Sequence, residues 1–172
     1  AAGPLLGDKN TAVTLNGSTG YITVSDARTL DAPGAVSLEA WVTTTSAAQE
    51  QIIIGKGAAK ATMNYLLELN SSGKPNFIAN GGSNHAATTG LSASTWYHIV
   101  VTCNGINVLH YINGTLDATV TLTDTLITNT SSLNIGSTPA LFFSGSIDEV
   151  AVYNYTLSAT QILAHYNIGK CI

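Results

Sequence analysis

The chain has 172 residues and a mass of 17.8 kDa, about the size of one domain with its own hydrophobic core. Only 9% of the residues are charged, well below the usual share of roughly 25%, which excludes a coiled coil and a charge-driven disordered chain. The net charge is -4 and the six Lys and Arg residues are scattered, so the basic stripe that nucleic-acid binding requires is missing. Apolar runs are far shorter than the roughly twenty residues of a membrane-spanning helix, and we expect no membrane insertion.

The polarity of the chain comes from Thr, Ser, Asn and Gly rather than from charge. These residues favour turns and strand surfaces over helices. Secreted and surface-displayed β-rich modules often have this composition, and we therefore expect an extracellular, cell-surface or virion-surface setting. The first ten residues lack the basic start and apolar centre of a signal peptide. We expect either a mature protein or a segment of a longer one.

Short apolar segments that alternate with polar residues recur along the chain, each followed by a turn signal, which is typical of an all-β fold. The first half contains the predicted strands 12–15, 21–24, 36–42, 52–54, 64–69 and 76–79. The first two are separated by Asn16-Gly17-Ser18-Thr19-Gly20, and the last two by Ser71-Ser72-Gly73-Lys74-Pro75. Gly and Pro supply turn geometry, so the second connection predicts a hairpin.

Three consecutive antiparallel strands are predicted in the middle of the chain, at 96–102, 106–112 and 115–121. They are joined by Cys103-Asn104-Gly105 and Ile112-Asn113-Gly114. Asn-Gly is favoured in two-residue hairpins because both positions take a positive φ. Two more strands are predicted at 132–135 and 145–153.

One helix is predicted near the end of the chain, at 158–168. Ser158 and Gln161 have the spacing of a capping box, and Leu157 and Ile162 that of a hydrophobic staple. Gly169 is expected to end the helix. The predicted fold is a single all-β domain over residues 1–172: a two-sheet antiparallel sandwich with one short C-terminal helix lying on it.

The order of these motifs resembles a laminin G-like domain of the concanavalin A-like lectin/glucanase superfamily, whose fold is a jelly roll. The matching pieces are Ser37-Leu38-Glu39-Ala40-Trp41-Val42, Trp96-Tyr97-His98-Ile99-Val100-Val101-Thr102, Tyr111-Ile112-Asn113-Gly114, Leu133-Asn134-Ile135-Gly136 and the segment 143–153. Residues 13–17 and 20–24 fit the first hairpin of the family. The resemblance covers almost the whole chain and implies the fold. It leaves the function open, because this fold hosts lectins, adhesion modules, glycan hydrolases and spacers.

The resemblance also implies a structural calcium that joins the first hairpin to the last strand. Carried over to this chain, its ligands are Asn16, the carbonyl of Gly17 and Asp148, and oxygen ligands of this kind suit calcium. Asn16 stands where the family often has Asp, which removes one negative charge. The alternative is a turn asparagine with a local hydrogen bond, together with an acid at a bulge.

A glycan-binding surface is the second candidate site. Sugars are bound by aromatic rings and by amide, carboxylate or imidazole groups, and the segment 76–85 is rich in such groups around Gly81-Gly82. The predicted ligand-binding residues are Asn76, Asn80, Asn84 and His85, with Asn64 and Tyr65 from the neighbouring strand. The alternative is an ordinary solvated hairpin connection. Phe142 and Phe143 either line the same site or lie in the core.

Other aromatic and titratable residues have a structural interpretation. Trp41, Trp96 and Tyr111 belong to family motifs that pack the sandwich. Strand alternation makes Glu39 point the same way as Trp41, and His98 the same way as Trp96. The two residues either form a buried Glu–His pair or lie exposed on a sheet face.

The two cysteines are Cys103 and Cys171. A disulfide between them would close a loop of about 68 residues (171 minus 103), which loop-entropy models value at on the order of 4 kcal/mol. Two separate thiols are the alternative, because the sequence does not give the Cα separation that a disulfide requires.

Catalytic motifs are weak in this sequence. Hydrolases of the superfamily carry paired carboxylates two or four residues apart on one strand, whereas Asp148 and Glu149 are adjacent and are expected to point to opposite faces. The four histidines lack metal-ligand spacing. We therefore expect a non-catalytic extracellular module that binds glycan on a cell surface or matrix. The alternative is a structural building block of a virion, fibre or surface layer, through self-assembly or fusion to a larger protein.

Overall fold

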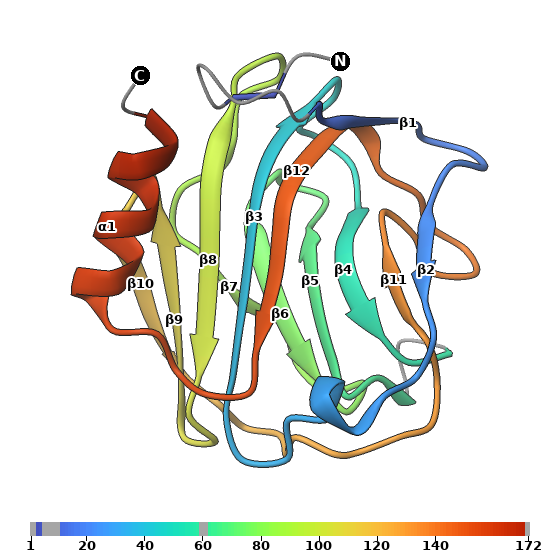
Figure 1. The fold of residues 1–172 in the computed structure, drawn as a ribbon, viewed down its shortest axis with the longest axis vertical. Helices are drawn as coiled ribbons and strands as arrows, with labels where there is room; N and C mark the ends of the chain where they lie inside the picture. The colour runs from blue at the N-terminus through green and yellow to red at the C-terminus, as the bar shows by residue number, and fades with distance from the viewer. Residues whose placement is uncertain (1–2, 5–10, 59–61, 171–172) are drawn as a thin grey trace.

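The computed structural model describes residues 3–4, 11–58 and 62–170, which fold into two six-stranded antiparallel sheets (Figure 1). The first sheet has the spatial order β1 (Val13–Asn16), β12 (Ser144–Tyr153), β3 (Val36–Thr44), β8 (Tyr97–Cys103), β9 (Asn107–Ile112) and β10 (Thr115–Thr121). The second has the order β2 (Ile22–Val24), β11 (Leu133–Ile135), β4 (Gln51–Lys56), β5 (Tyr65–Leu69), β6 (Pro75–Ala79) and β7 (His85–Ala86). A short 3-10 helix, η1 (Arg28–Leu30), follows β2. The predicted all-β sandwich is confirmed.

The hydrophobic core lies between the two sheets, and strand alternation explains its composition. In β3, Leu38, Ala40 and Val42 are fully buried and point toward the second sheet, while the residues between them point to the outer face. Tyr65 and Leu67 of β5 meet them from the other side. Two inner faces that interdigitate in this way are what hold a β-sandwich together.

One of the two predicted Asn-Gly turns is confirmed as a two-residue turn. The other is longer, because three residues, 104–106, separate β8 from β9, and of Asn104 and Gly105 only Gly105 has a positive φ. Asn113 and Gly114 both have a positive φ, 51° and 75°, in the hairpin between β9 and β10. In the hairpin between β5 and β6, Gly73 has a φ of 70°, and the Asn70 side chain accepts hydrogen bonds from two backbone N–H groups of the turn. The strand β7 was not predicted, because two residues are too few to show alternation.

The first predicted hairpin is wrong. The strands β1 and β2 belong to different sheets, because β1 pairs with β12 and β2 pairs with β11. The side-chain oxygen of Asn16 accepts hydrogen bonds from the N–H groups of Ser18, Thr19 and Gly20, at 2.9–3.0 Å. This local Asx turn redirects the chain away from the first sheet and into the second.

The C-terminal helix α1 (Ala159–Lys170) lies on the outer face of the first sheet (Figure 1). It starts with the predicted capping box, in which Gln161 N–H donates to Ser158 Oγ and Ser158 N–H donates to Gln161 Oε1. Leu157 and Ile162 are buried against the sheet. The helix continues through Gly169, which was expected to end it. Gly169 is buried and lines the same hollows as Trp41.

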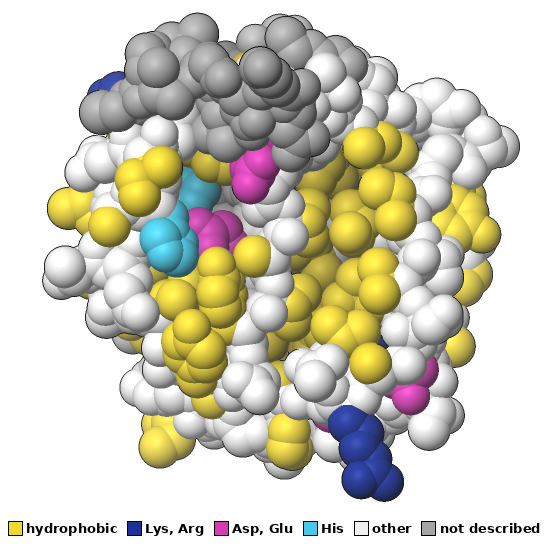
Figure 2. All heavy atoms as spheres, viewed as in Figure 1, with side chains coloured by type: hydrophobic (Ala, Val, Ile, Leu, Met, Phe, Trp, Pro, Cys, Tyr) yellow, Lys and Arg dark blue, Asp and Glu magenta, His cyan; other side chains and the backbone are white. Residues whose placement is uncertain are grey.

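An apolar groove of ≈ 220 Å³ lies between the edges of the two sheets, on the far side of β12 from the helix. Figure 2 shows it as a broad hydrophobic area. Its apolar lining consists of Val13, Leu15, Ile22, Ile135, Ile147 and Val150. Among the described residues, no helix is both long and apolar enough to cross a membrane.

Candidate functional site

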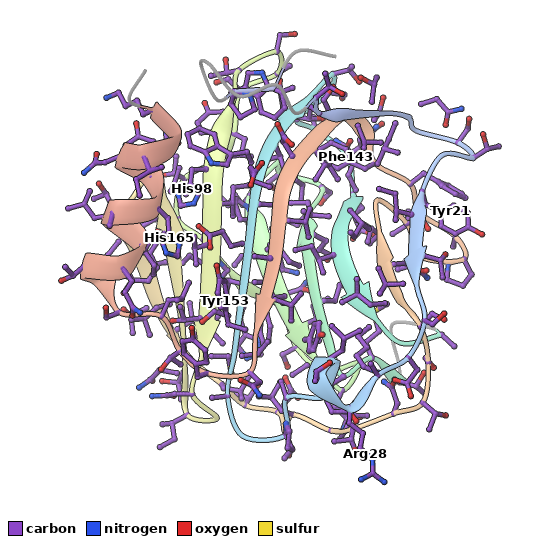
Figure 3. All side chains as sticks on the ribbon, in the orientation of Figure 1. Tyr21, Arg28, His98, Phe143, Tyr153 and His165 are labelled. Atoms are coloured by element: carbon purple, nitrogen blue, oxygen red, sulfur yellow. The ribbon has the colours of Figure 1, made fainter. Side chains whose placement is uncertain are left out.

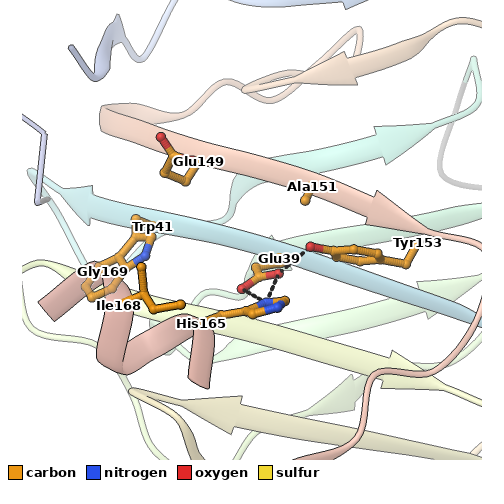
Figure 4. A pocket seen from close by; sticks show the side chains of 8 residues that line it. All are labelled: Glu39, Trp41, Glu149, Ala151, Tyr153, His165, Ile168 and Gly169. Atoms are coloured by element: carbon orange, nitrogen blue, oxygen red, sulfur yellow. Dashed lines mark hydrogen bonds and ion pairs between the residues drawn. The ribbon is translucent and has the colours of Figure 1, made fainter. Parts of the chain in front are cut away.

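The candidate site is a cleft of ≈ 270 Å³ on the outer face of the first sheet, where α1 leaves part of β3 and β12 uncovered. Figure 4 shows the side chains that line it: Glu39 and Trp41 from β3, Glu149, Ala151 and Tyr153 from β12, and His165, Ile168 and Gly169 from α1. Imidazole and carboxylate groups meet beside hydrophobic side chains on this face in Figure 2. The cleft therefore combines charged, hydrogen-bonding and aromatic groups.

The pairing of the strands places these side chains together. Glu39 lies opposite Ala151 on β12 and opposite Val100 on β8. Because Ala151 carries only a methyl group, it leaves space beside the carboxylate. The register of β12 on β3 shifts between Asp148 and Ala151, and Glu149 within this bulge has a φ of 48°. A bulge re-aims side chains next to it, and here it brings Glu149 to the rim of the cleft.

The Glu39 carboxylate is the centre of the site. It is only 6% exposed and accepts hydrogen bonds from three side chains. His98 Nε2 lies 2.7 Å from Oε1, His165 Nδ1 lies 3.1 Å from both oxygens, and Tyr153 OH donates to Oε2 at 3.0 Å. The buried Glu39–His98 pair that the sequence left open is confirmed. His98, His165 and Tyr153 lie on the same side of the molecule in Figure 3.

These contacts shift two pKa values. Burial alone would raise the pKa of Glu39, but the hydrogen bonds and charge of His98 and His165 more than offset it, and the net pKa is lowered. Burial, followed by the charge of Glu39 and the hydrogen bond to it, raises the pKa of Tyr153 to about 12. Glu39 is therefore an anion at neutral pH, and Tyr153 keeps its proton.

Aromatic rings continue the site beyond Glu39. Trp41 stacks on Tyr166 of α1 with ring centroids 5.8 Å apart, and it lies 5.1 Å from the His98 ring. Trp41 and Gly169 also line a second hollow of ≈ 240 Å³, together with Pro4, Trp96, Asn113, Tyr166 and Lys170. The two hollows thus share one wall. Trp96 is half-buried there, whereas Trp41 and Tyr111 are buried on the outer face of the first sheet, next to α1.

Three of the predicted ligand-binding residues are fully buried and cannot reach a ligand on this surface. Tyr65 lies in the core, where its OH donates to Leu30 O at 2.9 Å. Asn76 lies in β6, within the predicted strand 76–79, and its Nδ2 donates to Glu68 and Asn84. Asn64 also has no exposed surface. The composition that suggested a binding site over 76–85 is divided between the buried strand β6 and the turn that follows it, and only the turn is exposed.

The remaining predicted ligand residues are at the β6–β7 turn, on the second sheet and not in the cleft. His85 is buried, and its ring contacts Phe77 O and the N–H of Thr123. Asn80 and Asn84 are exposed. A role of these two residues in ligand binding stays a prediction.

The two phenylalanines differ in their surroundings. Phe143 is fully buried in the core, as one of the two alternatives held. Phe142 is half-buried, and its ring centroid lies 6.4 Å from that of Tyr21.

The structure does not bring the predicted calcium ligands together. Asn16 lies opposite Ser144, and Asp148 lies four residues further along β12, which is about 13 Å at the rise of a strand. The oxygen of the Asn16 side chain is used by the Asx turn, and Asp148 Oδ1 accepts the N–H of Glu149. Asn16, Gly17 and Asp148 therefore do not fit a single calcium ion, whose ligands must all lie within about 2.6 Å of it. Calcium as a cofactor of this chain stays a prediction.

The proposed disulfide has one partner outside the described residues, Cys171. Cys103 is buried at the end of β8, and burial raises the pKa of its thiol.

Sequence reasoning missed the residues that α1 and β12 contribute to the site. His165 and Tyr166 follow the buried Ile162 by three and four positions, and Gly169 follows it by seven. This spacing places all four on one face of a helix, which is the signal that could have identified them. No local sequence signal shows which strand faces this helix.

The family profile described as Concanavalin A-like lectin/glucanases superfamily matches residues 16–163. The chain belongs to this superfamily. A search of curated proteins gives no match.

Solved structures with the same fold include modules that bind carbohydrate. The carbohydrate-binding module of the Ruminococcus gnavus IT-sialidase, bound to α2,3 sialyllactose, matches with a TM-score of 0.72 and 18% identity, over 90% of this chain and 96% of that chain. Domain 4 of AbnA, an extracellular arabinanase from Geobacillus stearothermophilus, in complex with arabinotriose, gives 0.67 and 18%, over 91% and 82%. The heptameric SAP-like pentraxin from Limulus polyphemus gives 0.67 and 14%, over 87% and 78%.

Proposed function

We propose that this chain is a non-catalytic, extracellular carbohydrate-binding module, and that the cleft between β3, β12 and α1 binds a neutral glycan. Carbohydrate-binding modules and a pentraxin among the structures with the same fold support glycan binding in general. The low share of charged residues supports an extracellular setting. The observation that carries the proposal is the fixed Glu39 carboxylate at the floor of an open, partly aromatic cleft.

The hydrogen bonds to Glu39 determine what the cleft offers to a ligand. Because Tyr153 donates its proton to Glu39, its oxygen is left to accept a hydrogen bond. In the neutral form, His165 donates from Nδ1, so that Nε2 is an acceptor, and this side chain is 35% exposed. Glu149 adds an exposed carboxylate. Acceptors held in fixed positions match sugar hydroxyl groups, which are donors, and Tyr153 and Ile168 provide apolar surface for the sugar ring.

The charges of the cleft favour a neutral ligand over an acidic one. Of the eight described residues that line it, two are glutamates and His165 is the one that can carry a positive charge. Carboxylate and sulfate groups are bound most strongly by arginine. Arg28 is the single arginine of the sequence, and Figure 3 shows it at the bottom of the molecule, away from His165 on the left flank.

The state of Glu39 supports a binding role rather than catalysis. Glycoside hydrolysis needs one carboxylic acid with a raised pKa as proton donor, beside a second carboxylate. Glu39 and Glu149 line the same cleft, but the pKa of Glu39 is lowered and its oxygens are occupied by three donors. If a glycan that binds to the protein were cleaved during prolonged incubation, the non-catalytic assignment would be wrong.

A glycan array that pairs neutral oligosaccharides with their sialylated and sulfated forms tests the proposal. We expect binding to neutral members and weaker binding when the same oligosaccharide carries an acidic group. Tyr153→Ala should weaken binding about tenfold or more, as expected for an aromatic contact. Tyr21→Ala makes the same chemical change at a tyrosine that is 52% exposed and distant from the cleft, and it should bind like the unmodified chain.

Each binding measurement is made below the melting temperature of the variant, so that unfolding does not mimic lost binding. Binding to acidic glycans alone would overturn the neutral specificity. If the two tyrosine variants lose glycan affinity equally, the cleft is not the binding site. If no glycan binds, the proposed function is wrong.

A further inference from the structure

Lys56 is a lysine with no exposed surface, which is rare for this residue type unless the charge is paired. It is the last residue of β4, and its side chain extends to two loops that lie far apart in the sequence. One loop leads from β2 through η1 to β3, and the other leads from β10 to β11.

Among the residues that the structure describes, five oxygen atoms surround the Lys56 ammonium group within 3.4 Å. Asp26 Oδ1 lies at 2.7 Å, the backbone oxygens of Asn129 and Ser131 at 2.9 and 3.0 Å, Asn129 Oδ1 at 3.3 Å and Asp31 Oδ1 at 3.4 Å. An ammonium group has three N–H donors. The cage therefore holds more oxygen atoms than the ammonium can bind by hydrogen bonds.

Asp31 Oδ1 is the oxygen that the three N–H donors of Lys56 leave without a hydrogen bond. It is buried and has no hydrogen bond to any described residue, so its contact with Lys56 is a contact between charges. A mixture of carboxylate, amide and backbone carbonyl oxygens around one positive charge is the ligand set of a hard cation such as calcium. The arrangement differs from an ordinary ion pair, in which one carboxylate meets one ammonium group.

The cage also fixes the loops around it. The Asn129 side chain donates to the backbone oxygens of Lys56 and Thr62, and its Oδ1 accepts the N–H of Ser131. Leu30, next to Asp31, accepts a hydrogen bond from Tyr65 OH. Two long connections are thus attached to the second sheet at one point of positive charge, which is the task that structural metal ions perform in other loop-rich proteins.

We propose that the Lys56 ammonium group occupies a cation-binding site, as a built-in substitute for a metal ion, and that shortening Lys56 opens this site to calcium. The inference is independent of the glycan-binding proposal, since Lys56 does not line the cleft. The proposed site also differs from the calcium site expected at Asn16 and Asp148, because the positions of those two residues on paired strands do not fit one calcium ion.

The test is the melting temperature of Lys56→Ala, measured with EDTA and at rising calcium concentrations. Removing one partner of a buried charge cluster should lower the melting temperature by about 10 °C in EDTA. Millimolar calcium should restore at least half of this loss. Magnesium should restore less, because it demands a smaller and stricter coordination shell. The unmodified chain should melt at the same temperature in EDTA and in calcium.

Three further variants separate a cation site from simple loss of packing. Lys56→Met removes the charge but fills the space, so it should be destabilised without recovery in calcium. Lys56→Ala combined with Asp26→Asn lacks one ligand charge and should recover less than Lys56→Ala alone. Lys74→Ala, at a half-buried lysine outside the cage, controls for the loss of a positive charge and should show no response to calcium.

If Lys56→Ala does not fold in EDTA, its refolding yield in calcium is measured instead, and recovery in calcium is expected. The inference is overturned if calcium fails to stabilise or refold Lys56→Ala, or if Lys56→Met is as stable as the unmodified chain. It is also overturned if calcium stabilises the unmodified chain as much as it stabilises Lys56→Ala.

Discussion

His110 is buried inside the sandwich, on the same face of β9 as the core residues Val108 and Ile112. Its Nε2 lies 2.7 Å from the backbone oxygen of His85, and its Nδ1 has no hydrogen bond within the described part of the chain. Burial lowers the pKa of His110 to about 4, although the bond to His85 and the charge of Asp117 act in the opposite direction. The native protein therefore holds this side chain in its neutral form at neutral pH.

This histidine predicts a pH dependence of stability. In the unfolded chain His110 takes up a proton near its ordinary pKa of 6.5, whereas the native state resists protonation down to about 4. The unfolded state binds more protons in this window, so the free energy of unfolding should fall between pH 6.5 and 4, by about 3 kcal/mol. Urea unfolding at several pH values measures it. His110→Gln keeps a donor for the backbone oxygen of His85, and it should reduce the dependence of the free energy of unfolding on pH. If this dependence is unchanged in the variant, His110 is not its cause.

Glu39 also affects the free energy of unfolding, but at lower pH, and its contribution likewise decreases as the pH falls. Because its folded pKa lies below the ordinary value of 4.5, its contribution is present above pH 4.5 and is lost as the pH falls further. The two groups can therefore be separated by pH.

At the residue scale, the sequence supports inferences about neighbours on adjacent strands and little beyond them. Alternation on two strands with recognisable motifs made a buried Glu39–His98 pair one of two alternatives, and the structure confirms it. Asn64, Tyr65 and Asn76 were misplaced because a polar or aromatic residue in a strand looks the same whether its face is covered or open. Burial depends on contacts that are distant in the sequence.

At the element scale, the turn between β9 and β10 contacts helix α1. Gly114 has a φ of 75°, and a Cβ atom added to it would lie 2.9 Å from Tyr166 Cδ1 and 3.1 Å from Leu163 Cδ1. Tyr166 in turn stacks on Trp41. The turn thus limits how closely the helix approaches the sheet and supports the wall that the two hollows share.

Gly114→Ala should destabilise the protein by about 1–3 kcal/mol, because it adds backbone strain and displaces Tyr166. It should also weaken glycan binding by moving α1. Gly34→Ala is the matched control, since nothing lies within 4 Å of its added Cβ and its φ is not in the left-handed region. Urea unfolding compares the two variants, and equal stability would show that the turn does not position the helix.

The strands and the helix were predictable because their signals are local. Alternation marks β3 and β8, Asn113-Gly114 marks a turn, and Ser158 with Gln161 marks the start of α1. The assignment of β1 and β2 to different sheets was not predictable, because their partners β12 and β11 lie more than a hundred residues further along the chain. The site depends on the same long-range packing.

At the scale of the whole molecule, the apolar groove beside β12 bears on the building-block alternative. Val13 and Ile22, which line it, are 42% and 38% exposed, and apolar surface of this kind often meets another protein. A binding module predicts a monomer of 17.8 kDa in light scattering at micromolar concentration. Particles or filaments that grow with concentration would favour assembly, and Ile22→Ser should then reduce their size.

The central claim is that a neutral glycan binds in the cleft, and a crystal structure of the chain with the neutral oligosaccharide that binds most tightly tests it most directly. We predict a sugar ring against Tyr153 and Ile168, with hydroxyl groups that donate to Glu149 and His165. A sugar bound instead at the β6–β7 turn, beside Asn80 and Asn84, would contradict the assignment of the cleft and restore the site first predicted from the sequence.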